Sequence, residues 1–317
     1  MRTAFLDYET VSSGDLDTTS LSRSAPEIRF YPSTTESQLG ERIADAQIVL
    51  INKLELTRER LEGARKLELI AIAGTGTDDV DLAAAEERGI AVCNVRGYCT
   101  ASVVQHAWAL ILSLTQHLGQ YARLATDGSW VETEKYAVLA NPSRELSGRV
   151  LGIVGWGTLG RGVAAVGEAF GMRSIICNRA GAPPELGRVS LDELLATADI
   201  VSLHCPLTPA TRGLIGAREL GLMKADALFI NTARGALVDG AALADALRAR
   251  RLGGAGIDVL PEEPPTHGDP LLAPDIPNLI VTPHIAWAAR EARQRCIDEM
   301  AANIADFRRG GRRGRVV

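Results

Sequence analysis

The chain has 317 residues, of which 46% are hydrophobic and 23% are charged, the proportions of a globular protein large enough for two domains. Its formal net charge of −5 argues against the broad basic surface that nucleic-acid binding requires, so a small molecule is the expected partner. The basic residues between Arg308 and Arg315 are the exception, and we expect them to form a solvated tail.

Cysteine usage and hydropathy indicate the cellular compartment of the protein. Five cysteines occur without a CxxC spacing, and no charged-then-apolar leader opens the sequence. The longest helical apolar stretch, residues 107–114, is far shorter than the roughly 20 residues that span a membrane. We therefore expect a reduced, cytoplasmic protein with no membrane contact, in which this stretch is a buried helix.

In the first hundred residues, short apolar runs alternate with helix-like segments, which predicts a parallel sheet built from β-α-β units. Ser33 and Glu36 have the spacing of a capping box and predict a helix start, and residues 79–88 predict another helix. The expected strands are residues 3–6, 28–31, 46–51, 67–73 and 90–93.

Residues 101–118 are apolar on most sides at helical spacing, which predicts a buried helix joining two domains. A polar stretch, residues 119–144, is expected to be irregular. The alternation that follows predicts a doubly wound sheet and a last helix over residues 288–307 that returns to the first domain. The expected strands of this second sheet are residues 149–154, 174–177, 200–204, 227–231, 254–258 and 279–282.

The predicted fold is therefore α/β, with two Rossmann-like parallel-sheet domains. A cofactor domain, residues 101–288, is inserted into a discontinuous substrate domain formed by residues 1–100 and 289–317. The substrate domain is expected to be flavodoxin-like.

Three glycines follow the first strand of the second sheet in the order GxGxxG. Gly155 permits the tight turn, Gly157 lets the backbone approach a pyrophosphate, and Gly160 allows close packing of the helix. The free N–H groups at the start of that helix bind the anion. In this context the motif predicts a dinucleotide site rather than a purely structural turn.

The choice of cofactor depends on the end of the next strand, where NAD enzymes usually carry an acid that binds the ribose. Here Asn178 is followed by Arg179. An aspartate would repel a 2′-phosphate, whereas a neutral amide beside a guanidinium accepts it, so NADP is favoured over NAD. The alternative is that Asn178 binds an unphosphorylated ribose and that Arg179 is merely exposed.

Three polar segments, residues 231–235, 258–264 and 282–284, follow later strands of the second sheet. Ligands of open α/β sheets gather at the carboxyl edge, so these segments are expected to converge on one cleft. Arg234 there would bind a carboxylate with two hydrogen bonds and polarise the adjoining carbonyl group. His284 titrates in the neutral range when unperturbed and would exchange a proton with the substrate oxygen.

Glu263 is the expected partner of His284, because a carboxylate favours the protonated ring and fixes its orientation. Glu262 competes for this role but should point elsewhere. Singly, each residue has a plain structural explanation: a surface ion pair, a solvated acid, a buried histidine. Together at one sheet edge with a pyrophosphate loop they predict catalysis, and no metal site is expected.

Five motifs closely resemble the D-isomer-specific 2-hydroxyacid dehydrogenases over essentially the whole chain. The resemblance implies that Arg234, Glu263 and His284 are catalytic and that the substrate is a small 2-keto or 2-hydroxy acid. The motifs are Gly155-Trp156-Gly157-Thr158-Leu159-Gly160, His204-Cys205-Pro206-Leu207-Thr208, Thr232-Ala233-Arg234-Gly235, Glu263-Pro264 and Thr282-Pro283-His284.

The resemblance also assigns the remaining site residues. Substrate would contact Lys53, Leu54, Thr75 and Gly76 together with Arg234 and His284. Members of the family are usually homodimers through the cofactor domain, so residues 101–118 and the segment around Trp130 are expected at an interface. The expected cofactor contacts are Gly155, Gly157, Thr158, Leu159, Gly160, Asn178, Arg179, Cys205, Pro206, Thr211, Thr232, Ala233, Arg234, Asp258, His284 and Trp287.

Within the family the sequence looks most like the glycerate dehydrogenases, also called hydroxypyruvate reductases, through Gly97-Tyr98, residues 103–106 and residues 287–295. Arg96 departs from the family, since a proline is expected there. Glyoxylate reductase and phosphoglycerate dehydrogenase stay open as alternatives. Formate dehydrogenases carry glutamine in place of Glu263, and the complete catalytic set disfavours a nucleotide-sensing corepressor.

Overall fold

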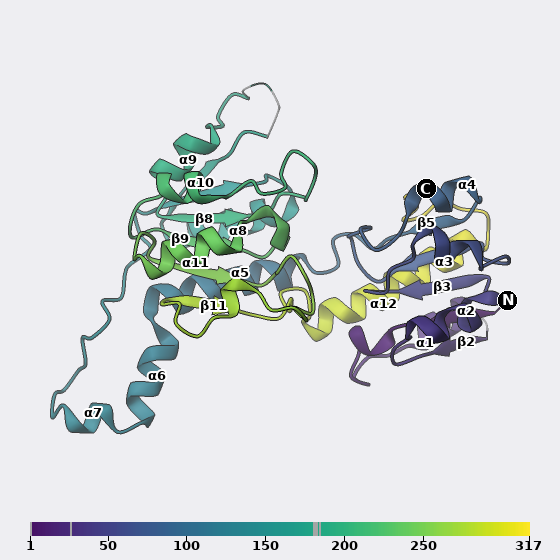
Figure 1. The fold of residues 1–317 in the computed structure, drawn as a ribbon, viewed down its shortest axis with the longest axis horizontal. Helices are drawn as coiled ribbons and strands as arrows, with labels where there is room; N and C mark the ends of the chain where they lie inside the picture. Colours follow the sequence, from purple (N-terminus) through teal and green to yellow (C-terminus); the bar gives the residue numbers. More distant parts are fainter. Residues whose placement is uncertain (1, 26, 180–182, 184) are drawn as a thin grey trace. The chain divides into compact units, whose positions relative to one another are not determined.

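The computed structural model describes residues 2–25, 27–179, 183 and 185–317, and it divides into two compact units (Figure 1). The first unit comprises Met1–Cys99 and Trp287–Val317, and the second comprises Thr100–Ala286. Each unit contains one parallel sheet. The two-sheet α/β architecture predicted from the sequence is confirmed.

The first sheet has five parallel strands in the order β2-β1-β3-β4-β5, which is the flavodoxin-like order. All five predicted strands are present. The register places Ile51 of β3 beside Ile72 of β4, so that these strands end level with one another. The strands are β1 (Thr3–Phe5), β2 (Ile28–Phe30), β3 (Ile48–Ile51), β4 (Leu69–Ile72) and β5 (Ala91–Cys93).

Helices cover both faces of this sheet because successive side chains of a buried strand point to opposite sides. Helices α1 and α12 pack on the face that carries Phe5, Leu50 and Leu69. Helices α2, α3 and α4 pack on the face that carries Val49 and Ile70. The bounds are α1 (Thr19–Ser24), α2 (Glu36–Ala44), α3 (Arg58–Glu62), α4 (Leu82–Glu87) and α12 (Arg290–Phe307), and a 3-10 turn, η1 (Tyr8–Thr10), follows β1.

The predicted capping box at Ser33 and Glu36 is wrong in its position. Helix α2 starts at Glu36, and Thr35 is its N-cap, with Gln38 as the reciprocal partner. The Nη1 atom of Arg42 binds the Ser33 carbonyl and the Thr34 hydroxyl, both at 2.6 Å. Ser33 is therefore held outside the helix, and the same type of cap forms two residues later.

The basic end of the chain is not the solvated tail that we expected. Val316 N donates to Val92 O at 2.7 Å, and Val92 N donates to Val317 O at 3.3 Å, so the last residues lie along β5. Val317 packs partly buried against the core of the first unit. The sequence did not indicate this backbone pairing, because the arginines of this segment predicted only exposed side chains.

The second sheet has six parallel strands in the order β11-β10-β9-β8-β6-β7, and all six were predicted. Strand β6 lies where the chain reverses its direction across the sheet, which is the position where this class of fold binds ligands. An isolated parallel bridge between Cys177 and Val189 adds to the edge beyond β7. The strands are β6 (Val150–Val154), β7 (Arg173–Ile176), β8 (Ile200–Leu203), β9 (Leu228–Asn231), β10 (Gly254–Ile257) and β11 (Leu279–Val281).

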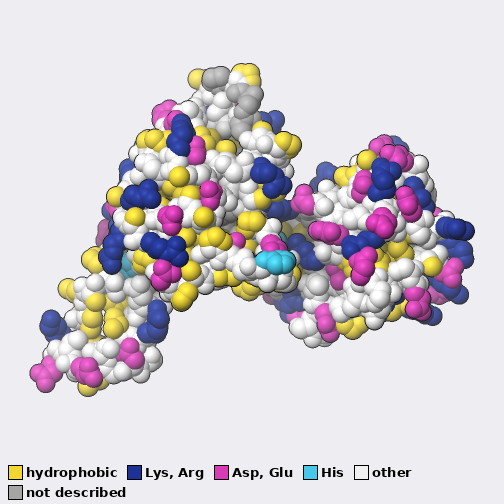
Figure 2. All heavy atoms as spheres, in the orientation of Figure 1, with side chains coloured by type: hydrophobic (Ala, Val, Ile, Leu, Met, Phe, Trp, Pro, Cys, Tyr) yellow, Lys and Arg dark blue, Asp and Glu magenta, His cyan; other side chains and the backbone are white. Residues whose placement is uncertain are grey.

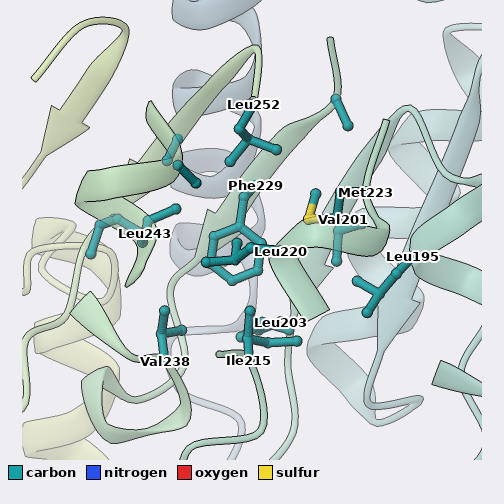
Figure 3. Close-up of a cluster of buried hydrophobic side chains, with 14 of the residues drawn as sticks. Leu195, Val201, Leu203, Ile215, Leu220, Met223, Phe229, Val238, Leu243 and Leu252 are labelled. Carbon is teal, nitrogen blue, oxygen red and sulfur yellow. The ribbon is translucent and has the colours of Figure 1, made fainter. Parts of the chain in front are cut away.

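One face of the second sheet is covered by α9, α10 and α11, whose side chains pack around Phe229 and Leu203 (Figure 3). The other face is covered by α5 and α8, and Trp108 of α5 donates a hydrogen bond to Val163 O at 3.1 Å. The bounds are α5 (Thr100–Gln116), α8 (Thr158–Ala169), α9 (Leu191–Thr197), α10 (Ala217–Leu222) and α11 (Gly240–Arg248), with 3-10 turns η2 (Gly235–Leu237) and η3 (Pro270–Leu272).

Residues 118–140 project from the second unit, and we call them the arm (Figure 1). The expectation of an irregular segment is wrong in part, because the arm contains α6 (Leu118–Thr126) and α7 (Ser129–Glu132). Its apolar side chains are exposed (Figure 2) and include Trp130, Val131 (82% exposed), Tyr136 (98%) and Leu139 (86%). Helix α5, by contrast, is buried in its own unit, as residues 107–114 predicted.

Throughout the described ranges, none of the helices combines the length and the apolar character that a membrane crossing would need.

Candidate active site

Five strands of the second sheet end level with one another. The register places Val154 beside Leu203, Leu203 beside Asn231, Asn231 beside Ile257, and Ile257 beside Val281. The five motifs identified in the sequence each begin at, or a few residues beyond, one of these positions. Gly155, His204, Thr232, Asp258 and Thr282 therefore start five neighbouring loops on the carboxyl edge of one sheet.

The glycine loop has the shape that a dinucleotide phosphate site requires. Gly155 has a φ of +107°, and a Cβ there would lie 2.5 Å from Cys205 N. A Cβ at Gly160 would lie 2.1 Å from Gly155 O, whereas the space at Gly157 is open. Gly157 precedes α8 without a side-chain cap, so the N–H groups of the first helical turn, at Thr158 and Leu159, face no competing acceptor from the N-cap.

Two buried polar atoms on this edge of the sheet have no hydrogen-bond partner among the residues described, and both belong to residues where a cofactor is expected. They are Nδ1 of His204 and Oγ1 of Thr232. The other ring nitrogen of His204 contacts Ser202 Oγ at 2.9 Å, and burial lowers the pKa of His204 to about 4, so the ring is neutral. Unpartnered buried polar atoms are costly, and hydrogen bonds to a bound dinucleotide would satisfy them. The residues present therefore fit this cofactor.

The loop after β8 owes its conformation to Thr211. Its hydroxyl group donates to Pro206 O at 2.8 Å and accepts from Thr208 N at 2.8 Å. Cys205 is half-buried, and burial raises the pKa of its thiol. Thr211 thus shapes the segment that packs against Gly155, and direct cofactor contacts of Cys205, Pro206 and Thr211 stay predictions.

Asn178 and Arg179 follow β7, as the sequence predicted. Asn178 Nδ2 donates to Pro183 O at 3.1 Å, and Asn178 N donates to Val189 O at 2.8 Å, so the backbone is fixed there. Arg179 is exposed, and no acid of the described chain pairs with its guanidinium. The position after β7 is therefore neutral at Asn178 and positive at Arg179.

His284 and Glu263 are hydrogen-bonded to each other through Nδ1 of the ring and Oε2 of the carboxylate. The second carboxylate oxygen accepts from Leu260 N at 2.7 Å, which fixes the orientation of Glu263. The side chains of His284 and Glu263 are 23% and 29% exposed, so both remain accessible to a ligand. Glu262 pairs with His267 and Thr266 instead, as expected for the competitor.

Arg234 lies three residues after β9 on a backbone that is closely packed against the Glu263 loop. A Cβ at Gly235 would lie 2.0 Å from Leu260 C, so only glycine permits this approach. Asn231 holds the turn, because its side chain accepts from Ala233 N at 3.0 Å and donates to Arg234 O at 2.9 Å. Arg234 itself is half-buried, and its Nη1 donates to Ala233 O at 2.8 Å.

Asp258 is fully buried and anchors the loop that carries His284. Its Oδ1 accepts from Thr282 Oγ1 at 2.5 Å and from Ile285 N at 3.0 Å, and its Oδ2 accepts from Ala286 N at 2.9 Å. Burial alone would raise the pKa of Asp258, but the hydrogen bonds from His106, Thr282 and these backbone groups outweigh burial and lower it. The cofactor contact expected of Asp258 stays a prediction, and the structure gives its carboxylate a positioning role.

Four of the predicted substrate residues, Lys53, Leu54, Thr75 and Gly76, belong to the first unit, on the carboxyl edge of its own sheet. The N–H groups of Thr75 and Gly76 donate to no acceptor in the part of the chain described. Asn94 supports this loop, because its Nδ2 donates to Thr75 O at 2.7 Å, and Arg96 Nε in turn lies 3.2 Å from Asn94 Oδ1. Arg96 is thus a cation beside the Thr75 loop, in place of the expected proline.

Lys53 and Leu54 follow β3 and line a pocket of about 280 Å³ together with Asp7 and Thr10. Asp7 Oδ2 accepts from Lys53 N at 2.6 Å and from Leu54 N at 3.0 Å, so this buried acid fixes the loop. Burial raises the pKa of Asp7, and the backbone hydrogen bonds only partly oppose the shift. Trp287 is also grouped with the first unit, where it packs partly buried on the core near α12.

Reasoning from the sequence missed the residues that support these loops. Asp7, Asn94 and His106 were given no role, although Asp7 and Asn94 directly follow predicted strands and His106 lies on an otherwise apolar helix. A polar residue at the carboxyl end of a strand is the signal that would have identified the first two.

The sequence is similar to those of known proteins. Residues 108–286 match the family model described as "D-isomer specific 2-hydroxyacid dehydrogenase, NAD binding domain". Glycerate dehydrogenase of Methylorubrum extorquens is 41% identical over 96% of both chains. Hydroxypyruvate reductase of Blautia hydrogenotrophica is 35% identical over 98% of both chains.

A solved structure extends the likeness to the whole fold. The crystal structure of D-lactate dehydrogenase from Aquifex aeolicus, complexed with NAD and lactic acid, has a TM-score of 0.82 and 28% identity. The match covers 98% of this chain and 96% of that one. With the glycine loop, the His284–Glu263 pair and Arg234 on one sheet edge, these likenesses confirm the predicted family: the chain belongs to the D-isomer specific 2-hydroxyacid dehydrogenases.

Proposed function

We propose that the protein reduces a small 2-keto acid, hydroxypyruvate or glyoxylate, to the D-2-hydroxy acid, with His284 as the general acid. The observation that carries the proposal is the hydrogen-bonded His284–Glu263 pair on the sheet edge that also carries the glycine loop. The glycerate dehydrogenase and hydroxypyruvate reductase relatives support this choice of substrate.

The proton step follows from the contacts of His284. Its Nδ1 is engaged by the carboxylate of Glu263, so Nε2 is the nitrogen available to the substrate. In reduction Nε2–H gives its proton to the carbonyl oxygen, and in oxidation Nε2 takes a proton from the hydroxyl group. Leu260 N fixes the orientation of Glu263, and Glu263 in turn fixes the orientation of the His284 ring.

Arg234 would bind the substrate carboxylate and polarise the keto oxygen through its guanidinium group. When bound, the nicotinamide supplies the hydride to the keto carbon. The residues that would hold the cofactor are the glycine loop, Asn178, Arg179, His204 and Thr232. In the first unit, the N–H groups of Thr75 and Gly76 would bind carboxylate oxygens, with Lys53 and Leu54 near the substrate.

NADP is the proposed cofactor in preference to NAD. An acid after β7 would repel a 2′-phosphate, and this chain has Asn178 there, followed by an exposed Arg179 that pairs with no acid of the described residues. A guanidinium forms charge-assisted hydrogen bonds with phosphate. Asn178→Asp should therefore shift the preference toward NADH.

The experiment is a set of initial rates with NADPH and NADH against hydroxypyruvate, glyoxylate, pyruvate and phosphohydroxypyruvate. We expect the highest kcat/KM with NADPH and hydroxypyruvate or glyoxylate, and a nearly inactive His284→Ala variant. Asn178→Asp should lower the NADPH:NADH ratio roughly tenfold, the value of about 1.4 kcal/mol of lost phosphate binding. Preference for NADH would overturn the cofactor choice alone, and no rate with any acid would overturn the reaction.

The arm is the proposed contact surface of a homodimer. Its exposed apolar residues surround a pocket of about 430 Å³ lined by Tyr121, Leu124, Trp130 and Tyr136, among others. Contiguous exposed apolar surface of this kind is typical of protein–protein contacts. Helix α5, which the resemblance also places at the interface, turns most of its apolar residues toward its own unit.

A further inference from the structure

We infer that His106 is a positioning residue for His284 and acts on it through Thr282 and Asp258. The inference rests on the proposed acid/base role of His284 and extends it to a helix that touches no reacting group. Helix α5 presents Ser102 and His106, four residues apart and therefore on one face, to the loop that follows β11. Ser102 Oγ donates to Ala286 O at 2.6 Å, and His106 Nε2 lies 3.0 Å from Thr282 Oγ1.

Counting the hydrogens assigns the direction of this chain of hydrogen bonds. The single hydroxyl hydrogen of Thr282 is used on Asp258 Oδ1, at 2.5 Å. Thr282 Oγ1 therefore accepts from His106, and Nε2 of His106 carries a hydrogen. The same nitrogen lies 3.4 Å from Asp258 Oδ1, and the two side chains are 18% and 0% exposed. His106 thus adds positive polarity to a carboxylate that water does not reach.

Asp258 transmits the effect to the catalytic loop. Its carboxylate accepts from Ile285 N and Ala286 N, and its carbonyl oxygen accepts from His284 N at 2.8 Å. His284 has a φ of +53°, a conformation that is unfavourable outside glycine and persists only where the surroundings hold it. Without His106 the buried carboxylate loses a donor, the loop loosens, and the His284–Glu263 alignment is lost.

The test compares His106→Leu, which removes the donor, with His106→Gln, whose amide places an N–H group near the position of Nε2. Thr115→Val is the matched control, since Thr115 is buried on the same helix and its hydroxyl group bonds, among the described residues, only to the carbonyls of Ile111 and Leu112. The measurements are kcat, KM for the keto acid, Kd for the reduced cofactor, and hydrogen–deuterium exchange of residues 282–288.

We expect His106→Leu to lower kcat about 10- to 100-fold with little change in cofactor Kd, because a small misplacement of a catalytic group costs this much. Amide exchange at residues 285 and 286 should speed up. His106→Gln should recover most of kcat, and Thr115→Val should keep kcat while lowering the unfolding temperature.

Two results would overturn the inference. If His106→Leu keeps the kcat of the parent enzyme and the slow exchange of the loop, His106 has only a packing role and the proposed reaction stands. If His284→Ala keeps full activity, the acid/base role fails, and the inference fails with it. Should His106→Leu not fold, His106→Asn takes its place, because its shorter amide does not reach the position of Nε2, and the same loss of kcat is expected.

Discussion

Asp7 and Asp258 occupy equivalent places in the two sheets, and the comparison between them shows how this fold fixes its loops. Each follows a strand at the carboxyl edge, each is buried, and each accepts backbone N–H groups from the loop after the neighbouring strand. Asp7 holds the Lys53 loop in the first unit, and Asp258 holds the His284 loop in the second. A buried carboxylate thus orders the loop at both edges.

The two carboxylates differ in what else they contact. Burial raises the pKa of Asp7, since only backbone groups oppose it. At Asp258, burial is outweighed by His106, Thr282 and two backbone groups, and the pKa is lowered. The catalytic loop is thus held by an ionised carboxylate with side-chain donors, whereas the Lys53 loop depends on a carboxylate that is less favoured as an anion.

The largest effect is expected for Asp258→Asn. An amide oxygen can replace Oδ1, but the NH2 group then faces Ala286 N, which is a donor. We expect kcat to fall roughly 100- to 1,000-fold, because the loop of the general acid loses its anchor. Steady-state kinetics and a crystal structure of the variant would measure this, and a kcat within threefold of the parent would contradict it.

A smaller effect is expected for Asp7→Asn, although the substitution is chemically the same. The amide oxygen can take the place of Oδ2 and keep Lys53 N and Leu54 N, at 2.6 and 3.0 Å. The NH2 group then opposes only Asn52 N, which lies 2.9 Å from Oδ1 and 3.1 Å from Oδ2 and can still donate to the retained oxygen. We expect KM for the keto acid to rise about two- to fivefold, with kcat nearly unchanged. Loss of kcat equal to that of Asp258→Asn would remove the distinction between the two anchors.

The smallest effect concerns stability and pH. The folded pKa of Asp7 is above the reference value of 3.8. Its contribution to the free energy of unfolding is therefore full below pH 3.8 and is lost as the pH rises through the folded pKa. The folded pKa of Asp258 is below 3.8. Its contribution to the free energy of unfolding is therefore present above pH 3.8 and is lost as the pH falls through the folded pKa.

Unfolding temperatures of the parent and both Asn variants, measured across this range, test the signs. Relative to Asp7→Asn, the unfolding temperature of the parent should fall by a few degrees as the pH rises from about 4 to 7, since 1 kcal/mol is worth roughly 2–4 °C in a unit of this size. Relative to Asp258→Asn, the unfolding temperature of the parent should fall only below about pH 4. Shifts of the same sign at both sites would refute the comparison.

Much of the fold was readable in the sequence because strands that are buried on both faces form continuous apolar runs. All eleven strands of the described residues were predicted. The glycine loop, Arg234, Glu263 and His284 were expected together because parallel strands bring their carboxyl ends to one edge. Periodicity and turn chemistry are local properties, and these features depend mainly on them.

The missed features depend on partners distant in the sequence. His106 meets Thr282 across 176 positions, and Asp7 meets Lys53 across 46. The pairing of Val316 with Val92 likewise has no local signal, since arginines and glycines precede it. The cap of α2 moved by two residues because Arg42 already engages Ser33 and Thr34.

The way the chain threads through the two units has a consequence for its synthesis. The core of the first unit needs Cys296, Ile297 and Met300 of α12 as well as the early strands, whereas Thr100–Ala286 is one uninterrupted segment. Translation proceeds from the amino end, and units generally fold when their residues are complete. On the ribosome, the part of the first unit that is made first, Met1–Cys99, must therefore wait, with its early strands uncovered, until α12 emerges.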